Sequence, residues 1–193
     1  MQTPILPGEP TPPPAPATPE MAARLAVNRR GKLTGAQKRR ALLIGLGALS
    51  FALCPLALLV QMVGALLLTD LPVPTLGGLL FTAVGVFFAL LLLALFGANA
   101  HTFLGEAFSR QPVRHAHGPL ELRVSEGNRP ELPFSYIVGD YSFAPYVAPA
   151  ELPMRVGAPY LVYYGARSRL LLSMTALDAP DAEEWLPQFE PPR

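Results

Sequence analysis

Two histidines spaced two residues apart, His115 and His117, are the first side chains in this sequence that could bind a metal ion. On a strand, this spacing places both imidazoles on one face. A stable zinc site needs a third and usually a fourth ligand at suitable spacing. The other histidine, His101, falls at the edge of a long apolar stretch, and the single cysteine, Cys54, falls inside it. We therefore predict a polar linker here, with no metal site.

A second group combines aromatic rings with positive charge: Tyr160, Tyr163, Tyr164, Arg167 and Arg169. Tyrosine rings stack on bases and arginines neutralise phosphates, so the group could form a platform for nucleic acid. Tyrosine is also favoured in strands because it packs well there. We predict that these residues form the core and rim of a β domain.

Catalytic patterns are absent from the sequence. It contains no Ser/His/Asp or Cys/His arrangement and no glycine-rich phosphate loop. The predicted β domain contains no close pair of carboxylates. We therefore predict a protein that is not an enzyme, with no catalytic, cofactor-binding or metal-binding residues and no cofactor.

The chain is organised around residues 41–105, which contain only one of its 29 charged residues, Asp70. The runs 41–69 and 77–98 each reach the length of about 20 residues that a membrane-spanning helix needs. Residues 70–75 are too short to allow anything but an antiparallel hairpin. The spans offer few polar side chains, so a carrier is disfavoured and an anchor is predicted. Those side chains are Ser50, Gln61, Thr82 and Asn99.

Small residues recur at four-residue spacing within the spans, in the pairs Ala41/Gly45, Ala48/Ala52 and Gly85/Ala89. Such pairs let helix backbones approach closely. Packing within the hairpin is the favoured interpretation, and self-association into a homo-oligomer is the alternative.

Basic residues are concentrated before the first span, at Arg24, Arg29, Arg30, Lys32, Lys38, Arg39 and Arg40. Lys and Arg beside a span are retained in the cytoplasm. None occurs in 70–75, whereas Arg110 and Arg114 follow the second span. We predict a multi-pass protein of the bacterial cytoplasmic (inner) membrane with both termini cytoplasmic. Contact of the basic segment with anionic lipid headgroups and binding of nucleic acid are the alternative uses of this charge.

Two helix starts precede the first span. Thr18, followed by Pro19 and Glu20, has the composition of a helix N-terminus. Thr34 and Gln37 fit the capping-box pattern, in which each side chain satisfies a backbone amide of the other residue. The second helix is expected to continue directly into the first span.

The region after residue 118 alternates apolar and polar residues, which is typical of strands. A strand is predicted at 120–124, and a hairpin joins 134–138 to 141–146 across Gly139 and Asp140. Its register pairs Val138 with Tyr141, Tyr136 with Phe143 and Phe134 with Pro145 on the buried face. A second hairpin joins 161–164 to 169–175. Five strands in this length predict a small all-β barrel or sandwich of the oligonucleotide-fold (OB) or SH3-like kind.

The predicted organisation has six parts: a disordered proline-rich arm at 1–18, basic juxtamembrane helices at 19–40, a two-helix transmembrane hairpin at 41–105, a linker at 106–118, the small β domain at 119–177 and an acidic tail at 178–193. In the tail, one helical turn is expected to lay Trp185 and Leu186 on the β domain.

Two segments carry a resemblance to a known family. Residues 25–37, LAVNRRGKLTGAQ, resemble the segment that precedes the spans in uncharacterised bacterial two-span membrane proteins, and residues 160–173, YLVYYGARSRLLLS, resemble the closing hairpin of their small C-terminal β domains. The resemblance implies a bacterial inner-membrane protein and supplies no catalytic residues. The layout is also loosely similar to that of NfeD-type proteins, in which a membrane span carries a small barrel that partners a membrane protease.

The function expected from the sequence is a membrane-anchored protein-interaction or scaffold module with a cytoplasmic β domain and an unidentified protein partner. The alternative is a membrane-tethered domain that senses a ligand or nucleic acid.

Overall fold

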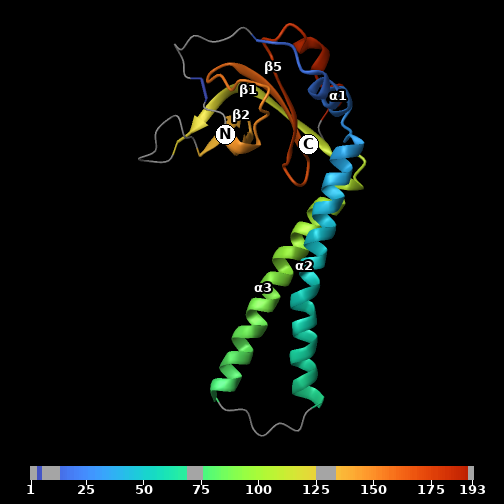
Figure 1. The fold of residues 1–193 in the computed structure, drawn as a ribbon, viewed down its shortest axis with the longest axis vertical. Helices are drawn as coiled ribbons and strands as arrows, with labels where there is room; N and C mark the ends of the chain where they lie inside the picture. The colour runs from blue at the N-terminus through green and yellow to red at the C-terminus, as the bar shows by residue number, and fades with distance from the viewer. Residues whose placement is uncertain (1–3, 6–13, 69–75, 125–133, 191–193) are drawn as a thin grey trace. The chain divides into compact units, whose positions relative to one another are not determined.

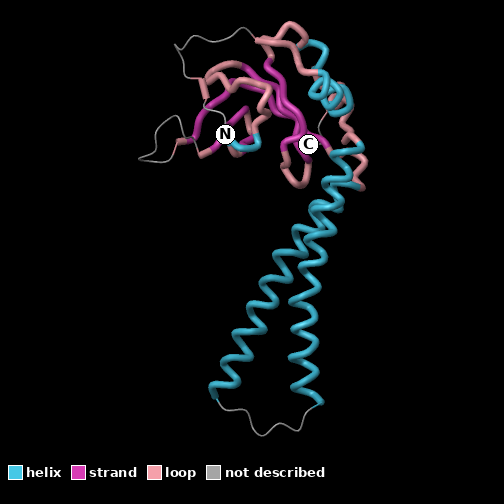
Figure 2. The backbone as a smooth tube through the Cα atoms, viewed as in Figure 1, coloured by secondary structure: helices cyan, strands magenta, loops and turns pink. Residues whose placement is uncertain are grey.

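The computed structural model describes residues 4–5, 14–68, 76–124 and 134–190. The chain divides into two compact units, one of Met1–Gln37 with Ser109–Arg193 and one of Lys38–Phe108. We call them the β unit and the helical unit. The first contains the strands and the second the long helices (Figures 1 and 2). The predicted connection at 70–75 lies outside the described residues.

Two long helices, α2 (Gly35–Leu68) and α3 (Leu76–Ala107), account for the helical unit, and α2 begins in the β unit. Large apolar side chains lie exposed along both helices. Phe51 on α2 is 64% exposed, and Phe81 on α3 is 80% exposed. Both helices are long and apolar enough to cross a membrane, as the sequence predicted.

The two helices contact each other through small residues. A Cβ on Gly45 would lie 2.8 Å from Cγ of Leu104, and one on Gly85 would lie 3.3 Å from Cε of Met62. Ala41, Ala52 and Ala89 are buried. These contacts favour packing within the hairpin as the role of the small residues.

Three polar side chains in the apolar parts of α2 and α3 bond within their own helix. Ser50 donates to the Leu46 carbonyl at 3.0 Å, Thr82 to the Gly78 carbonyl at 2.9 Å, and Asn99 to the Leu95 carbonyl at 2.8 Å. Each bond reaches back four residues, which satisfies the side chain without a partner from another helix.

Five strands form an open antiparallel sheet in the β unit, with order β3-β2-β1-β4-β5. They are β1 (Val113–Arg123), β2 (Ser135–Val138), β3 (Tyr141–Phe143), β4 (Pro159–Gly165) and β5 (Leu171–Ala176). Short 3-10 helices, η1 (Pro145–Val147) and η2 (Ala182–Trp185), lie between and after them. The prediction of five strands is confirmed. The described strands form an open sheet with β3 and β5 at its two edges.

β1 starts earlier than the sequence predicted, so part of the expected linker at 106–118 is a strand. Its first half pairs with β4, from Val113 opposite Gly165, and its second half pairs with β2, from Leu120 opposite Val138. The expected strand began at Leu120 because only the second half alternates apolar with charged residues. The first half of β1 lies in the middle of the sheet. There, pairing with β4 favours the strand conformation although the residues themselves do not alternate in polarity.

The β2–β3 hairpin has the predicted register. Tyr136 pairs with Phe143 and Val138 with Tyr141, and all four side chains are at most 6% exposed. The continuation to Phe134 and Pro145 was wrong, because β3 ends at Phe143 and Phe134 is 70% exposed.

Gly139 starts the turn of this hairpin with φ 59°, in the left-handed region that glycine tolerates best. A Cβ there would lie 2.8 Å from the His117 carbonyl oxygen. The turn therefore needs glycine both for its backbone conformation and for its close approach to β1.

The sheet is buried on both faces at β4, where side chains alternate between two apolar clusters. One cluster contains Tyr160, Val162 and Tyr164 together with the β2–β3 hairpin. The other contains Leu161 and Tyr163 together with α1 (Pro19–Asn28) and the C-terminal segment. The members of this second cluster are Met21, Leu25, Leu33, Val113, Leu161, Tyr163, Leu172 and Trp185.

Helix α1 is therefore part of the β unit, beside β5 (Figure 1). Both predicted helix starts are confirmed. Thr18 Oγ1 accepts from the Met21 amide at 3.3 Å, and Thr34 and Gln37 form the reciprocal capping box at 3.2 and 2.9 Å. The predicted juxtamembrane helices at 19–40 did not include this packing, because the sequence does not show that Leu25 packs in one cluster with Leu161, which is far along the chain.

The described parts of the N-terminal arm lie against the β unit. Ile5 bridges to Arg155 in parallel register, and its amide donates to the Met154 carbonyl at 2.8 Å. Further along, the Ala17 amide donates to Asp181 Oδ2 at 2.9 Å. Proline cannot donate from its backbone, but an extended arm still offers carbonyls and the amides of its other residues for docking.

Candidate interaction surface

The histidine pair lies on β1, where His115 is half-buried and His117 is exposed. His115 packs edge-on against Phe189 at 5.5 Å between ring centroids and also contacts Tyr163. Burial, followed by the charge of His117, lowers the pKa of His115. Among the described residues, no group of three His, Cys, Asp or Glu side chains is placed to hold a metal ion. His115 serves as a packing residue of the second cluster.

The tyrosines that could have formed a nucleic-acid platform are buried. Tyr160 and Tyr163 are 0% exposed and Tyr164 is 2% exposed, which confirms core packing for them. Their hydroxyls bond internally: Tyr160 donates to the Pro153 carbonyl at 2.7 Å, and Tyr163 to the Trp185 carbonyl at 2.6 Å. Burial raises the pKa of both groups. These rings cannot stack on bases without unfolding the sheet.

A buried polar network joins the segment before α2 to the sheet. Asn28 is fully buried, and its amide oxygen accepts from the Ser173 hydroxyl at 2.8 Å. Asn28 also bonds to Gln37 at 2.9 Å, and Gln37 donates to the Leu172 carbonyl at 3.1 Å. The sequence analysis identified Gln37 as a capping residue but did not identify Asn28. The network is structural, because its side chains satisfy one another.

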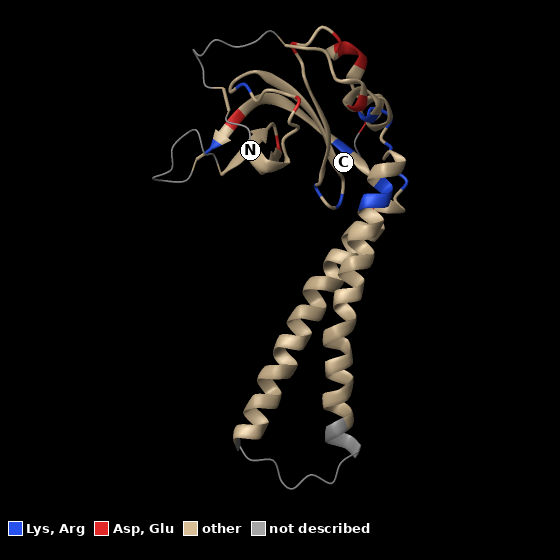
Figure 3. Cartoon of the chain, viewed as in Figure 1, with Lys and Arg blue, Asp and Glu red and all other residues tan. Residues whose placement is uncertain are grey.

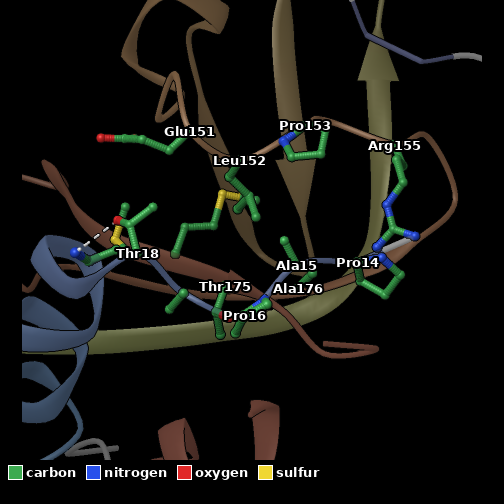
Figure 4. Close-up of a pocket in the computed structure, with 13 residues that line it drawn as sticks. Pro14, Ala15, Pro16, Thr18, Glu151, Leu152, Pro153, Arg155, Thr175 and Ala176 are labelled. Carbon is green, nitrogen blue, oxygen red and sulfur yellow. Dashed lines mark hydrogen bonds between the residues drawn. The ribbon is translucent and has the colours of Figure 1, made fainter. Parts of the chain in front are cut away.

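One small cavity of about 30 Å³ lies where the proline-rich arm crosses the sheet (Figure 4). Pro14 and Pro16 form one wall, Leu152 and Pro153 the opposite wall, and Ala176 of β5 the floor. A volume of that size holds about one water molecule. The arm lines this cavity, and the space that is left is too small for a ligand larger than water.

A larger, open cleft of about 380 Å³ lies at the β3 edge of the sheet. We call it the edge cleft; it is lined by Arg123, Phe134, Ser135, Ser142, Phe143, Ala144 and Tyr146. Tyr146 is 77% exposed, whereas the other five tyrosines of the chain are at most 2% exposed. Phe134 is 70% exposed in the same cleft. Two large, exposed aromatic side chains thus line one cleft with polar neighbours, a composition found at protein interfaces.

The edge cleft borders a strand whose outer side pairs with no other described strand. A two-residue turn makes Val138 and Tyr141 a hydrogen-bonded pair, so the next pair, Ile137 and Ser142, is not hydrogen-bonded. The amide and carbonyl of Ser142 therefore point away from β2, toward the open edge. This geometry can accept one further strand.

The C-terminal turn behaves as predicted at one of its two residues. Trp185 is 9% exposed, and its indole donates to Asp181 Oδ2 at 2.8 Å. Leu186, however, is 48% exposed, because the chain leaves the 3-10 turn in an extended conformation at that residue. No family model, curated protein or solved structure matches this chain.

Proposed function

We propose that this protein is a membrane-anchored interaction module whose β unit binds an extended segment of a protein partner at the edge cleft. The observation that carries the proposal is the exposed pair Phe134 and Tyr146 beside the open edge of β3. Strand addition would supply backbone hydrogen bonds at Ser142, and the two aromatic side chains would supply specificity. α2 and α3 would anchor the module in the membrane.

Both termini are placed in the cytoplasm in this proposal. The β unit combines chain from before α2 with chain from after α3, and the Asn28–Ser173 hydrogen bond joins the two. One folded unit of this kind requires both flanks to be on the same side, which supports two crossings. The basic residues of those flanks favour the cytoplasmic side.

Cysteine labelling in intact cells tests this orientation. In a Cys54→Ala background, a cysteine at Thr75 should react with an impermeant maleimide, and one at Ser168 should react only after lysis. The reverse labelling pattern would exclude cytoplasmic termini.

Site-specific photo-crosslinking tests the edge cleft. A benzophenone amino acid at Tyr146 of the full chain, in its native membrane, should give one discrete protein adduct. The same group at Leu186, which is also apolar and exposed, is the matched control and should not give that adduct. Ser142→Pro should abolish the adduct while keeping the fold, because proline is tolerated on an edge strand but removes the outward amide.

Two results would refute the edge docking: no discrete adduct at Tyr146, or an adduct that persists in Ser142→Pro. A nuclease-sensitive adduct would instead favour the sensing function.

A further inference from the structure

The start of β1 and the β4–β5 turn meet at one end of the β unit. The Ala166 amide donates to the Pro112 carbonyl at 2.8 Å, and Arg114 of β1 lies opposite Tyr164 of β4. Four arginines belong to the two segments that meet here: Arg110 and Arg114 lie on either side of Pro112, and Arg167 and Arg169 follow Ala166. We call this surface the basic end; it consists of Arg110, Arg114, Arg167 and Arg169.

The charge at the basic end is largely uncompensated. Arg110, Arg167 and Arg169 are exposed and Arg114 is half-buried. The two salt bridges among the described residues involve Arg24 and Arg155, both elsewhere. Asp140 is one carboxylate whose charge reaches this end: it raises the pKa of Tyr164, whereas Arg169 and Arg114 lower it. Figure 3 shows the β4–β5 turn in blue and the η2 segment, farther along the β unit, in red.

Arg169 is held in place before any ligand arrives. Its guanidinium carbon lies 5.3 Å from the centroid of the Tyr164 ring and 5.5 Å from that of Tyr141. The two rings stack at 4.3 Å, and Arg169 also donates to the Asp140 carbonyl at 3.1 Å. A guanidinium fixed in this way loses little side-chain freedom when it binds a phosphate.

The same end of the β unit carries both connections to the apolar helices. Arg110 follows the last residue of α3 by three positions, and Gln37, which bonds to the Leu172 carbonyl, precedes the apolar run of α2 by four. Four helical residues rise only about 6 Å. If the helices span a membrane, these short connections leave lipid phosphates within reach of this end.

We propose that the basic end binds the phosphate groups of anionic phospholipids and thereby docks the β unit on the membrane surface. Nucleic acid fits less well, because the tyrosines that could stack on bases are buried. The proposal rests on the membrane location proposed above. If the chain does not insert into lipid discs, that location is refuted. If the chain inserts but its β unit docks equally on neutral and anionic lipid, this proposal alone is refuted.

The experiment uses the full chain with Cys54→Ala and a fluorophore on Ala166→Cys, reconstituted in lipid discs. Quenching by acrylamide, which is neutral, reports the exposure of the β4–β5 turn. We expect markedly weaker quenching in discs that contain phosphatidylglycerol than in discs of phosphatidylcholine alone. The difference should vanish at about 1 M salt, where the screening length is about 3 Å.

Arg110→Gln with Arg167→Gln should restore strong quenching in the anionic discs. Each arginine lost should weaken docking about fivefold, corresponding to ~1 kcal/mol near an anionic surface. Arg24→Gln removes the same charge from the outer face of α1 and is the matched control, with no change expected. Arg167→Lys should retain protection. Circular dichroism of each variant verifies the fold.

Three results would overturn the proposal. The first is equal quenching in neutral and anionic discs. The second is full competition by millimolar glycerophosphate, which would identify a soluble phosphate ligand instead of a lipid surface. The third is protection in neutral discs by an added oligonucleotide that exceeds the protection by anionic lipid, which would identify nucleic acid as the ligand.

Discussion

Leu25→Ala provides a direct test of whether α1 belongs to the β unit. Leu25 is 0% exposed and packs in the second cluster with Leu161, Tyr163 and Trp185. Leu-to-Ala changes in cores cost about 2–5 kcal/mol, depending on how far the site collapses. α1 covers the cluster from outside and can move inward, so we expect about 3 kcal/mol. With a urea m-value of about 2 kcal/mol/M, the midpoint should fall by about 1.5 M.

The chain contains its own reporter for this measurement. Trp185 is its single tryptophan and lies in the same cluster, so its fluorescence follows this part of the fold in detergent-solubilised full chain. Arg24→Ala is the control on the same helix, because its exposed pair with Glu20 contributes only about 0.3–0.5 kcal/mol. A midpoint for Leu25→Ala no lower than that of Arg24→Ala would show that α1 does not pack on the sheet.

Four further substitutions test the sheet. Phe143→Ala should cost about 3–5 kcal/mol and Ser142→Ala under about 1 kcal/mol by the same unfolding assay, because only Phe143 faces the core; equal costs would contradict the register. Tyr163→Phe should lower the free energy of unfolding by about 1–3 kcal/mol, since it leaves a buried carbonyl unpaired. An unchanged free energy of unfolding would show that this hydrogen bond does not stabilise the fold. His115 has a folded pKa below its unfolded value of 6.5, so its stabilisation is present above pH 6.5 and is lost as the pH falls through the folded pKa. His115→Asn should therefore flatten the acid-side decline of the unfolding midpoint, and an unchanged decline would exclude His115 as its source.

The sequence by itself was sufficient for the features that depend on local pattern. Residues 41–105 contain a single charged residue, which predicts two apolar helices. This prediction needs no long-range information, because hydropathy and segment length are properties of consecutive residues. The register of the β2–β3 hairpin follows from its two-residue turn, which leaves one pairing that puts Tyr136 and Phe143 on the same face. The Thr34–Gln37 capping box spans only three residues, so its prediction also needed no long-range information.

The tertiary structure alone decided the features that depend on distant partners. Asn28 bonds to a serine 145 residues away, and Leu25 is buried by strands far along the chain. The early start of β1 at Val113 results from its pairing with β4. The composition of residues 113–119 does not predict this pairing. The same holds for the two proposed surfaces. Phe134 and Tyr146 line one cleft because β2 starts where β3 ends, and the segment of Arg110 meets that of Arg167 because β1 pairs with β4. Local sequence sets which face of a strand is apolar, whereas long-range packing sets which of those faces is covered.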